Sequence, residues 1–248
     1  AAVKAASDIT CTSSNAVEVV RSLGVDEVIF IPDRYLGSWV ASQVPDIEVV
    51  VHDGACEVHE RFTGAEVDEL RALHQGVAVL AHPECPPDVL AAADVVGSTK
   101  LMHDWVRDHQ PSSVAMITEC SMADNVAADA PDTDFIRPCN MCPHMKRITI
   151  QNIRTALETM THEVVVDRDT AARARLAVAA AKGDGPGRAV ELRNRDHDGG
   201  LERGEAERRV LPLAHALKLE RLRSDVGDVQ LGQYLLGGLC VVEGRATH

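Results

Sequence analysis

Two cysteines in the second half of the chain, Cys139 and Cys142, form a C-x-x-C motif that is followed by Pro143. Thiols at this spacing serve as redox dithiols, as half of a zinc site or as ligands of an iron–sulfur cluster. Zinc is the less favoured of these, because such a site needs a second close pair of ligands and Cys85 and Cys120 stand alone. The motif by itself leaves the chemistry open.

A further thiol, Cys56, follows Gly54 directly after a β-branched run that we expect to be a strand. Glycine lets the backbone turn, which would bring the thiol to the edge of a sheet. A free cysteine also packs commonly as a small hydrophobic residue. Cys56 is therefore either a core residue or a ligand.

His82, Pro83 and Glu84 end another expected strand. The proline stiffens the turn, so imidazole and carboxylate hold fixed directions. Such a pair suits general acid–base catalysis or the binding of a substrate carboxylate. The alternative is that Glu84 caps the helix that begins near Pro86 and that His82 is a hydrogen-bonded structural residue.

Hydroxyl groups precede two expected helices, in Thr12-Ser13-Ser14-Asn15 and in Gly97-Ser98-Thr99. Free backbone N–H groups and the helix dipole make such places anion sites, although simple N-caps have the same sequence. Glu119-Cys120-Ser121 follows a further strand. The remaining histidines considered, His52, His59, His103 and His109, have no partner spacing and are interpreted as structural or surface residues.

The elements that must position these residues form a βα pattern between residue 1 and about residue 167, which predicts an α/β fold with parallel strands. We expect strands at 28–33, 47–53, 77–84, 94–99, 113–119, 133–138 and 162–167. We expect helices at 15–24, 34–44, 66–74, 86–93, 100–109, 122–130 and 148–160. Thr63 and Glu66 have capping-box spacing before the third of these helices.

A weak internal repeat relates residues 28–56, 77–100 and 114–142, each of which reads as strand, turn, helix, strand and reactive turn. Parallel α/β sheets bind ligands beyond the carboxyl ends of their strands. We therefore expect one site built from residues at those ends: Cys56, His82, Glu84, Ser98, Thr99, Glu119, Cys139 and Cys142.

Beyond residue 168 the pattern gives way to a stretch rich in Arg, Ala, Gly and Asp, which predicts an irregular tail over 168–248 with short helices. The chain also begins without Met, inside an apparent βα unit. We therefore expect it to be a fragment.

The overall composition excludes several function classes. A hydrophobic content of 45% is enough for a core, whereas a net charge of -13 disfavours nucleic acid, whose phosphates would be repelled. No apolar run reaches the length of a membrane span, and the first residues lack the apolar core of a signal peptide. We expect a cytoplasmic protein, and in a reducing compartment such thiols are either buried apolar residues or metal ligands.

The chain resembles the quinolinate synthases. The segments SDITCTSSNAVEVV, FIPDRYLGSWVA, DGACEVHE, HPECPPDVLAAADVVGST, TECSM and CNMCPHMKRIT occur in the order seen in that family, between residues 1 and about 167. The resemblance implies three similar three-layer α/β sandwich domains around a pseudo-threefold axis, of which residues 1–167 supply about two repeats and part of another. It also implies condensation of iminoaspartate with dihydroxyacetone phosphate to quinolinate, in NAD biosynthesis.

By the same resemblance, Cys56 and Cys142 are two of the three ligands of an open-iron [4Fe–4S] cluster, and the third ligand would lie upstream of residue 1. The resemblance places substrate contacts at Ser13, His82, Pro83, Glu84 and Thr99. Glu84 is the implied proton carrier and His82 its partner. L-aspartate oxidase is an implied partner because it supplies iminoaspartate.

Cys139 resembles an additional cysteine of family members that form a C-x-x-C disulfide. Two alternatives remain open at this point. Beside a quinolinate synthase, the chain could be a non-catalytic zinc module that uses Cys139, Cys142, Cys56 and a histidine. The second alternative is a fragment of the enzyme that makes no quinolinate by itself.

Overall fold

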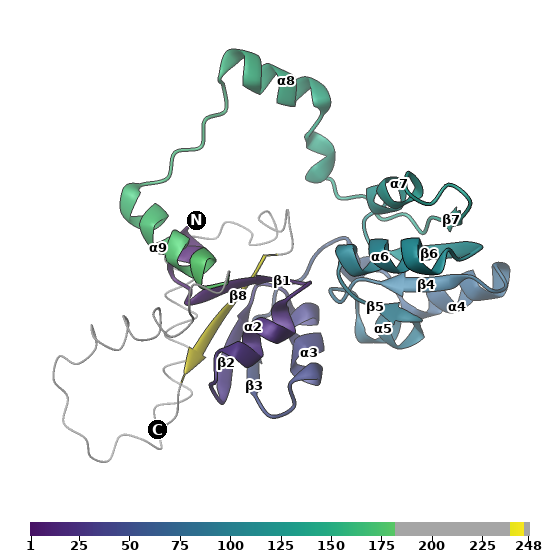
Figure 1. The fold of residues 1–248 in the computed structure, drawn as a ribbon, viewed down its shortest axis with the longest axis horizontal. Coiled ribbons are helices and arrows are strands. Elements are labelled where there is room, and N and C mark those ends of the chain that lie inside the picture. Colours follow the sequence, from purple (N-terminus) through teal and green to yellow (C-terminus); the bar gives the residue numbers. More distant parts are fainter. Residues whose placement is uncertain (182–238, 246–248) are drawn as a thin grey trace.

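The structure is a computed structural model in which residues 1–181 and 239–245 are described (Figure 1). The described residues form two four-stranded sheets with helices packed against them. Parallel strand pairs occur in both sheets, which confirms the predicted α/β class. The pseudo-threefold axis stays a prediction, as does the division into domains at residue 167.

The first sheet has the strand order β1-β8-β2-β3, formed by β1 (Ile9–Thr12), β8 (Leu239–Arg245), β2 (Glu27–Ile31) and β3 (Glu48–Val51). β2 and β3 are parallel, whereas β8 is antiparallel to both of its neighbours. Phe30, Leu36 and Val40 are fully buried in the core that joins this sheet to its helices, α2 (Ala16–Ser22) and α3 (Arg34–Gln43). α1 (Ala2–Ala5) lies beside α9 (Arg168–Ala180) at the edge of this unit.

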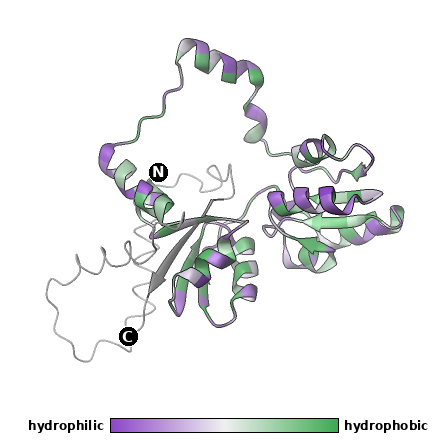
Figure 2. Ribbon diagram, in the orientation of Figure 1, coloured by the Kyte–Doolittle hydropathy of each residue, from purple (hydrophilic) through white to green (hydrophobic). Residues whose placement is uncertain are grey.

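The second sheet is parallel throughout and has the order β5-β4-β6-β7, from β5 (Val95–Val96), β4 (Ala78–Ala81), β6 (Ser113–Ile117) and β7 (Asp134–Ile136). Four helices accompany it, and Figure 2 shows the hydrophobic strands next to helices with polar outer residues. The helices are α4 (Gly64–Leu73), α5 (Pro87–Ala92), α6 (Thr99–His109) and α7 (Ser121–Ala127).

Alternation along β4 explains the layers of this second unit. Val79 packs in one core with residues of α4 and α5, whereas Leu80, its neighbour in sequence, packs in a separate core with residues of α6 and α7. Successive side chains of a strand point to opposite faces, so a strand that is apolar at both positions must be covered on both sides. The second unit is therefore a three-layer sandwich, with helices on each face of the sheet.

Two departures from the expected elements are informative. Residues 162–167 form no strand, and Val164 and Val165 are 85% and 81% exposed. A β-branched run needs a neighbouring strand to satisfy its backbone, and the described residues offer none there. Within the tail that is predicted to be irregular with short helices, residues 168–180 form the helix α9, whereas residues 239–245 form a strand, β8, that is not predicted. The rest of that tail, 182–238 and 246–248, lies outside the described residues.

The remaining helices are η1 (His59–Arg61), η2 (Met145–Arg147) and α8 (Ile150–Thr159). All seven expected helices are found, within a few residues of their predicted ends. None of the helices in the part of the chain that the structure describes is long and apolar enough to cross a membrane.

Capping boxes begin both α4 and α8, which allows a matched test of what a cap contributes. Thr63→Ala should lower the free energy of unfolding by about 1 kcal/mol, because Thr63 caps a helix that packs in the core. Thr149→Ala removes the same cap from α8, which buries no residue, so it should reduce helix content without moving the cooperative transition. Urea unfolding followed by circular dichroism measures both. Equal shifts for the two variants would contradict this.

Candidate active site

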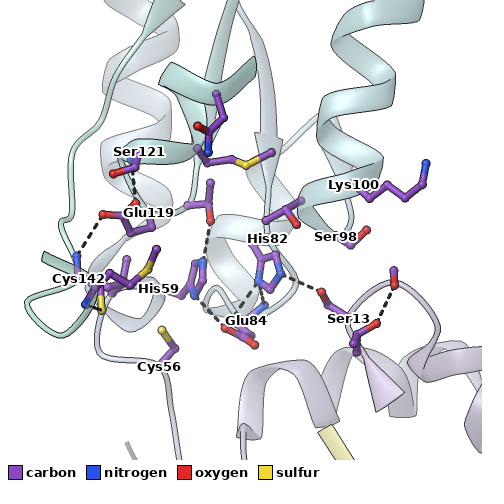
Figure 3. A pocket seen from close by; sticks show the side chains of 18 of the residues that line it. Ser13, Cys56, His59, His82, Glu84, Ser98, Lys100, Glu119, Ser121 and Cys142 are labelled. Atoms are coloured by element: carbon purple, nitrogen blue, oxygen red, sulfur yellow. Dashed lines mark hydrogen bonds and ion pairs between the residues drawn. The ribbon is translucent and has the colours of Figure 1, made fainter. Parts of the chain in front are cut away.

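A cavity of about 460 Å³ lies at the carboxyl ends of the strands of the second sheet and reaches the turn after β1 (Figure 3). The carboxyl ends of β1, β3, β4, β5, β6 and β7 contribute to its wall. The contributing segments are 12–14 after β1, 56–59 after β3, 82 and 84 after β4, 98–100 after β5, residues between 118 and 125 after β6, and residues between 142 and 145 after β7.

The predicted site residues meet at this cavity. Ser13, Cys56, His82, Glu84, Thr99 and Cys142 all line it, although Cys56 and Cys142 are far apart in sequence. Pro83 is buried behind the cavity wall and is not among the lining residues. The lining residues lie close together because the carboxyl ends of parallel strands meet at one edge of a sheet. The chemical roles of these residues stay predictions.

His59 is a cavity residue that the sequence analysis left among the structural histidines. Its ring is buried, with Nε2 2.9 Å from Oγ1 of Thr118 and Nδ1 3.0 Å from Oε2 of Glu84. It stacks on the ring of His82 at a centroid distance of 4.6 Å. The available signal was its spacing: His59 follows Cys56 by three residues, and one helical turn places such residues on the same side.

His59, Glu84 and His82 differ in their charge at neutral pH. Burial by itself would lower the pKa of His59, but its interactions with Cys56 and with the carboxylate of Glu84 raise that pKa to about 10. Burial opposes ionisation of Glu84, yet the hydrogen bond and charge of His59 lower its pKa. Burial lowers the pKa of His82 to about 4. At neutral pH the site therefore holds a His59–Glu84 ion pair beside a neutral His82.

The hydrogen bonds of His82 fix which of its nitrogens carries the proton. The backbone N–H of Glu84 lies 3.4 Å from Nδ1, which must accept, so Nε2 carries the proton and donates to Oγ of Ser13 over 3.1 Å. This second bond joins the turn after β1 to the second sheet. Glu84 does not cap α5, whose N-cap is Pro86 with no side-chain cap, so the alternative of a capping carboxylate is wrong.

The thiols divide into free and bonded groups. Cys139 forms a disulfide with Cys120 and is not paired with Cys142 within the C-x-x-C motif. Cys139 is also unavailable to the zinc site that had been considered. Cys56 and Cys142 are free and half-buried on the cavity wall. The free thiol of Cys85 is buried, which raises its pKa and leaves it an unreactive core residue.

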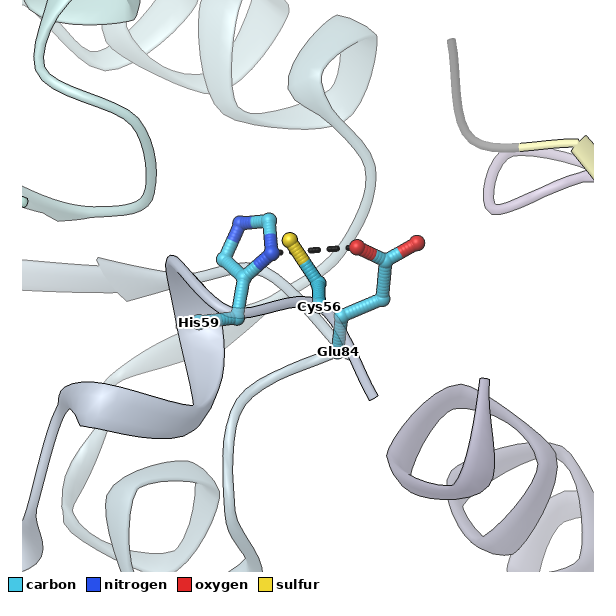
Figure 4. A group of neighbouring side chains, drawn as sticks. All are labelled: Cys56, His59 and Glu84. Atoms are coloured by element: carbon cyan, nitrogen blue, oxygen red, sulfur yellow. Dashed lines mark ion pairs between the residues drawn. The ribbon is translucent and has the colours of Figure 1, made fainter. Parts of the chain in front are cut away.

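Three donor atoms at the cavity lie close enough to hold a metal ion. Ligand atoms of Cys56, His59 and Glu84 lie within 4.8 Å of one another (Figure 4). The Nε2 of His59 already contacts Thr118, which orients the ring and directs Nδ1 into the group. Thiolate, imidazole and carboxylate are a ligand set that suits a transition metal.

Fold and cavity together define a class of protein: an α/β protein with free thiols and a buried acid–base pair at the carboxyl ends of parallel strands. The model of the family described as "Quinolinate synthetase A protein" matches residues 1–181. The chain belongs to this family.

Relatives with established names agree with this placement. Quinolinate synthase 1 of Mesorhizobium japonicum is 58% identical over 178 residues, which are 72% of this chain and 55% of that protein. The quinolinate synthase of Agrobacterium fabrum is 59% identical over 178 residues, 72% of this chain and 51% of that protein. That of Caulobacter vibrioides is 54% identical over 180 residues, 71% of this chain and 49% of that protein. The chain spans about half the length of these relatives.

Replacing His82 by glutamine should weaken the dependence of stability on pH below neutrality. His82 has a pKa of about 4 in the folded protein against an ordinary value of 6.5, so the unfolded chain takes up its proton first as the pH falls. Stability is therefore lost as the pH falls from 6.5 toward 4, by about 3 kcal/mol in full at about 1.4 kcal/mol per pKa unit.

Urea unfolding across this pH range measures the effect as the difference in free energy of unfolding between the wild type and His82→Gln. Burial raises the pKa of Asp33, which titrates in the same range in both, so the difference isolates His82. The control is His74→Gln, at an exposed position. Parallel curves for the wild type and His82→Gln would contradict the neutral state of His82.

Proposed function

We propose that this chain carries the cluster-binding and acid–base part of a quinolinate synthase. The activity would be the condensation of iminoaspartate with dihydroxyacetone phosphate to quinolinate, in NAD biosynthesis. The observation that carries the proposal is the meeting of two free thiols, Cys56 and Cys142, with the buried His59–Glu84 pair at one cavity. We further propose a cytoplasmic setting and L-aspartate oxidase as the supplier of iminoaspartate.

The thiols of the described residues fit part of a [4Fe–4S] site. Cys56 and Cys142 are half-buried and face the cavity, whereas Cys139 is held in its disulfide and Cys11 and Cys85 are buried in the core. Cys56 and Cys142 would hold two irons, and a third thiolate would be needed to leave one iron open. When bound, such a cluster supplies Lewis acidity toward a substrate nitrogen or carboxylate.

The side chains of the cavity would handle protons and anionic groups. Glu84 is ionised beside His59, so it can accept a proton and pass it on, because the charge of His59 favours return to the carboxylate form. Neutral His82 donates from Nε2 and orients Ser13 or a substrate oxygen. Thr99 begins α6 and lines the cavity, and the first N–H groups of a helix, which lack intrahelical partners, favour a carboxylate or phosphate.

A second candidate rests on the group of Cys56, His59 and Glu84, which could hold one metal ion without Cys142. The protein would then be a mononuclear metal-binding module. This candidate and the cluster share Cys56 but differ in their other ligands, and that difference makes them separable.

Anaerobic reconstitution with iron and sulfide tests both candidates in this chain. For a cluster, iron retention and broad visible absorption should fall strongly in Cys56→Ala and Cys142→Ala, and should persist in the control Cys11→Ala. For a mononuclear site, His59→Gln should abolish metal retention, and Cys142→Ala should leave it unchanged. Metal binding that survives loss of both Cys56 and Cys142 would overturn the cluster proposal.

The role of Glu84 can be tested in a chimera that joins residues 1–181 to the remaining part of a curated relative. Glu84→Gln should leave the cluster absorption intact and lower kcat by roughly 10²–10⁴-fold, the usual contribution of general acid–base catalysis. Glu48→Gln, at an exposed position on β3, is the control. Full activity of Glu84→Gln would remove the carboxylate from the proposed chemistry.

A further inference from the structure

The loop after β3 carries two side chains of the cavity, Cys56 and His59, yet its first part has no helix or strand to hold it. A hydrogen-bonded turn leads from Cys56 into η1, since the carbonyl oxygen of Cys56 accepts the N–H of Glu60 at 3.0 Å. Whatever fixes the backbone of Cys56 therefore also fixes His59.

A single carboxylate outside the cavity makes that connection. Oδ1 of Asp33 accepts the N–H of Leu36 at 2.8 Å, which caps α3, and Oδ2 accepts the N–H of Cys56 at 2.9 Å. Asp33 is 0% exposed. Hydrogen bonds from backbone N–H groups to a buried carboxyl group are strengthened by the low dielectric of the interior, and water does not compete for them.

Neighbouring contacts bring the same two segments together. The N–H of Arg34 donates to the carbonyl oxygen of Gly54 at 2.6 Å, and a Cβ at Gly54 would lie 2.4 Å from the carbonyl oxygen of Pro32. Glycine at position 54 thus permits the close approach that Asp33 requires.

Arg34 also forms ion pairs with Asp53 and Glu60, on either side of the loop. The side chains of Arg34 and Asp53 are 39% and 89% exposed, and exposed ion pairs contribute little because solvent screens them. The buried bonds of Asp33 should therefore dominate, with Arg34 as a weaker support.

We propose that Asp33 is a positioning residue, whose carboxylate ties the start of α3 to the backbone of Cys56 and so sets the thiol and His59 at the cavity. What this positioning serves rests on the proposed function. Oδ1 of Asp33 caps α3 and Oδ2 holds the N–H of Cys56, so a variant that keeps only the cap tests the proposal. Serine is as good an N-cap as aspartate, but its side chain is shorter and has one oxygen in place of two, so an oxygen that caps Leu36 does not also reach the N–H of Cys56.

The test compares Asp33→Ser with Asp167→Ser in the full chain. Asp167 is also an N-cap aspartate, accepting the N–H of Thr170 at 2.9 Å, but it holds only its own helix α9. Two measurements report on the loop directly: amide hydrogen exchange over residues 54–60, and the rate at which iodoacetamide alkylates Cys56. Alkylation of Cys142 in the same sample, followed by peptide mass spectrometry, is the internal reference.

Asp33→Ser should speed exchange of the Cys56 amide by about tenfold or more and raise alkylation of Cys56 relative to Cys142. Asp167→Ser should change neither, and Arg34→Gln should have a smaller effect than Asp33→Ser. Wild-type exchange and alkylation in a folded Asp33→Ser protein would overturn the proposal. Asp33→Asn, which keeps one acceptor and both polar atoms, is the second variant, and it too should speed exchange of the loop.

Loss of the fold in both variants would also overturn the proposal, because Asp33 would then support the whole first sheet rather than the loop. Neither measurement needs a bound cluster or turnover. Failure of the chain to bind iron would therefore count against the proposed function and leave the role of Asp33 standing. Unchanged exchange and alkylation in Asp33→Ser would count against the role of Asp33 and leave the proposed function standing.

Discussion

The buried ion pair between His59 and Glu84 is the constraint on which the cavity depends. An unpaired carboxylate removed from water to this degree would be strongly destabilising, and it would take up a proton instead of staying charged. His59 prevents this, with Nδ1 3.0 Å from Oε2 of Glu84. The pairing also explains why His82 stays neutral, because burial and the charge of His59 both lower its pKa. The loop after β3 and the loop after β4 must therefore meet accurately, or neither charge is tolerated.

That accuracy comes from carboxylates that hold backbone N–H groups rather than from secondary structure. Asp33 accepts the N–H of Cys56 at 2.9 Å, and Glu119 accepts that of Ser121 at 2.8 Å and lies 3.4 Å from that of Cys142. Each free cavity thiol thus follows a strand end and has its own N–H directed at a carboxylate from the neighbouring strand end. The bond to Cys142 is the longer and weaker one, and the Cys120–Cys139 disulfide adds a covalent link between the same two segments. The disulfide holds this loop while leaving Cys142 free.

Much of the fold and of the site could be predicted from sequence, for reasons that particular residues make clear. The runs around Val79 and Val114 alternate with amphipathic stretches, and parallel topology then required Cys56, His82, Glu84 and Cys142 to converge. His59 and Asp33 were missed because their importance lies in partners distant in sequence, Glu84 and the N–H of Cys56, and no local pattern reports such contacts. Residues 162–167 were predicted as a strand on composition alone, but a strand also needs a neighbour. α9 was missed because its arginine-rich, alanine-rich sequence resembles a linker, although Ala174, Ala177 and Ala180 bury one face.

The charges around the cavity bear on which ligands it can hold. The chain has a net charge of -13, and Glu57, Glu84 and Glu119 line the cavity. Against them stand protonated His59, which Glu84 already neutralises, and Lys100, which is paired with Asp104 and largely exposed. An anionic substrate would therefore find little net attraction in the ionised side chains of the described residues. Its binding would depend on hydroxyl and N–H donors at Ser13 and at the start of α6, together with a positive centre of another kind. An open iron of the proposed cluster at Cys56 and Cys142 would be such a centre, because a Lewis-acidic metal would bind a substrate oxygen or nitrogen directly.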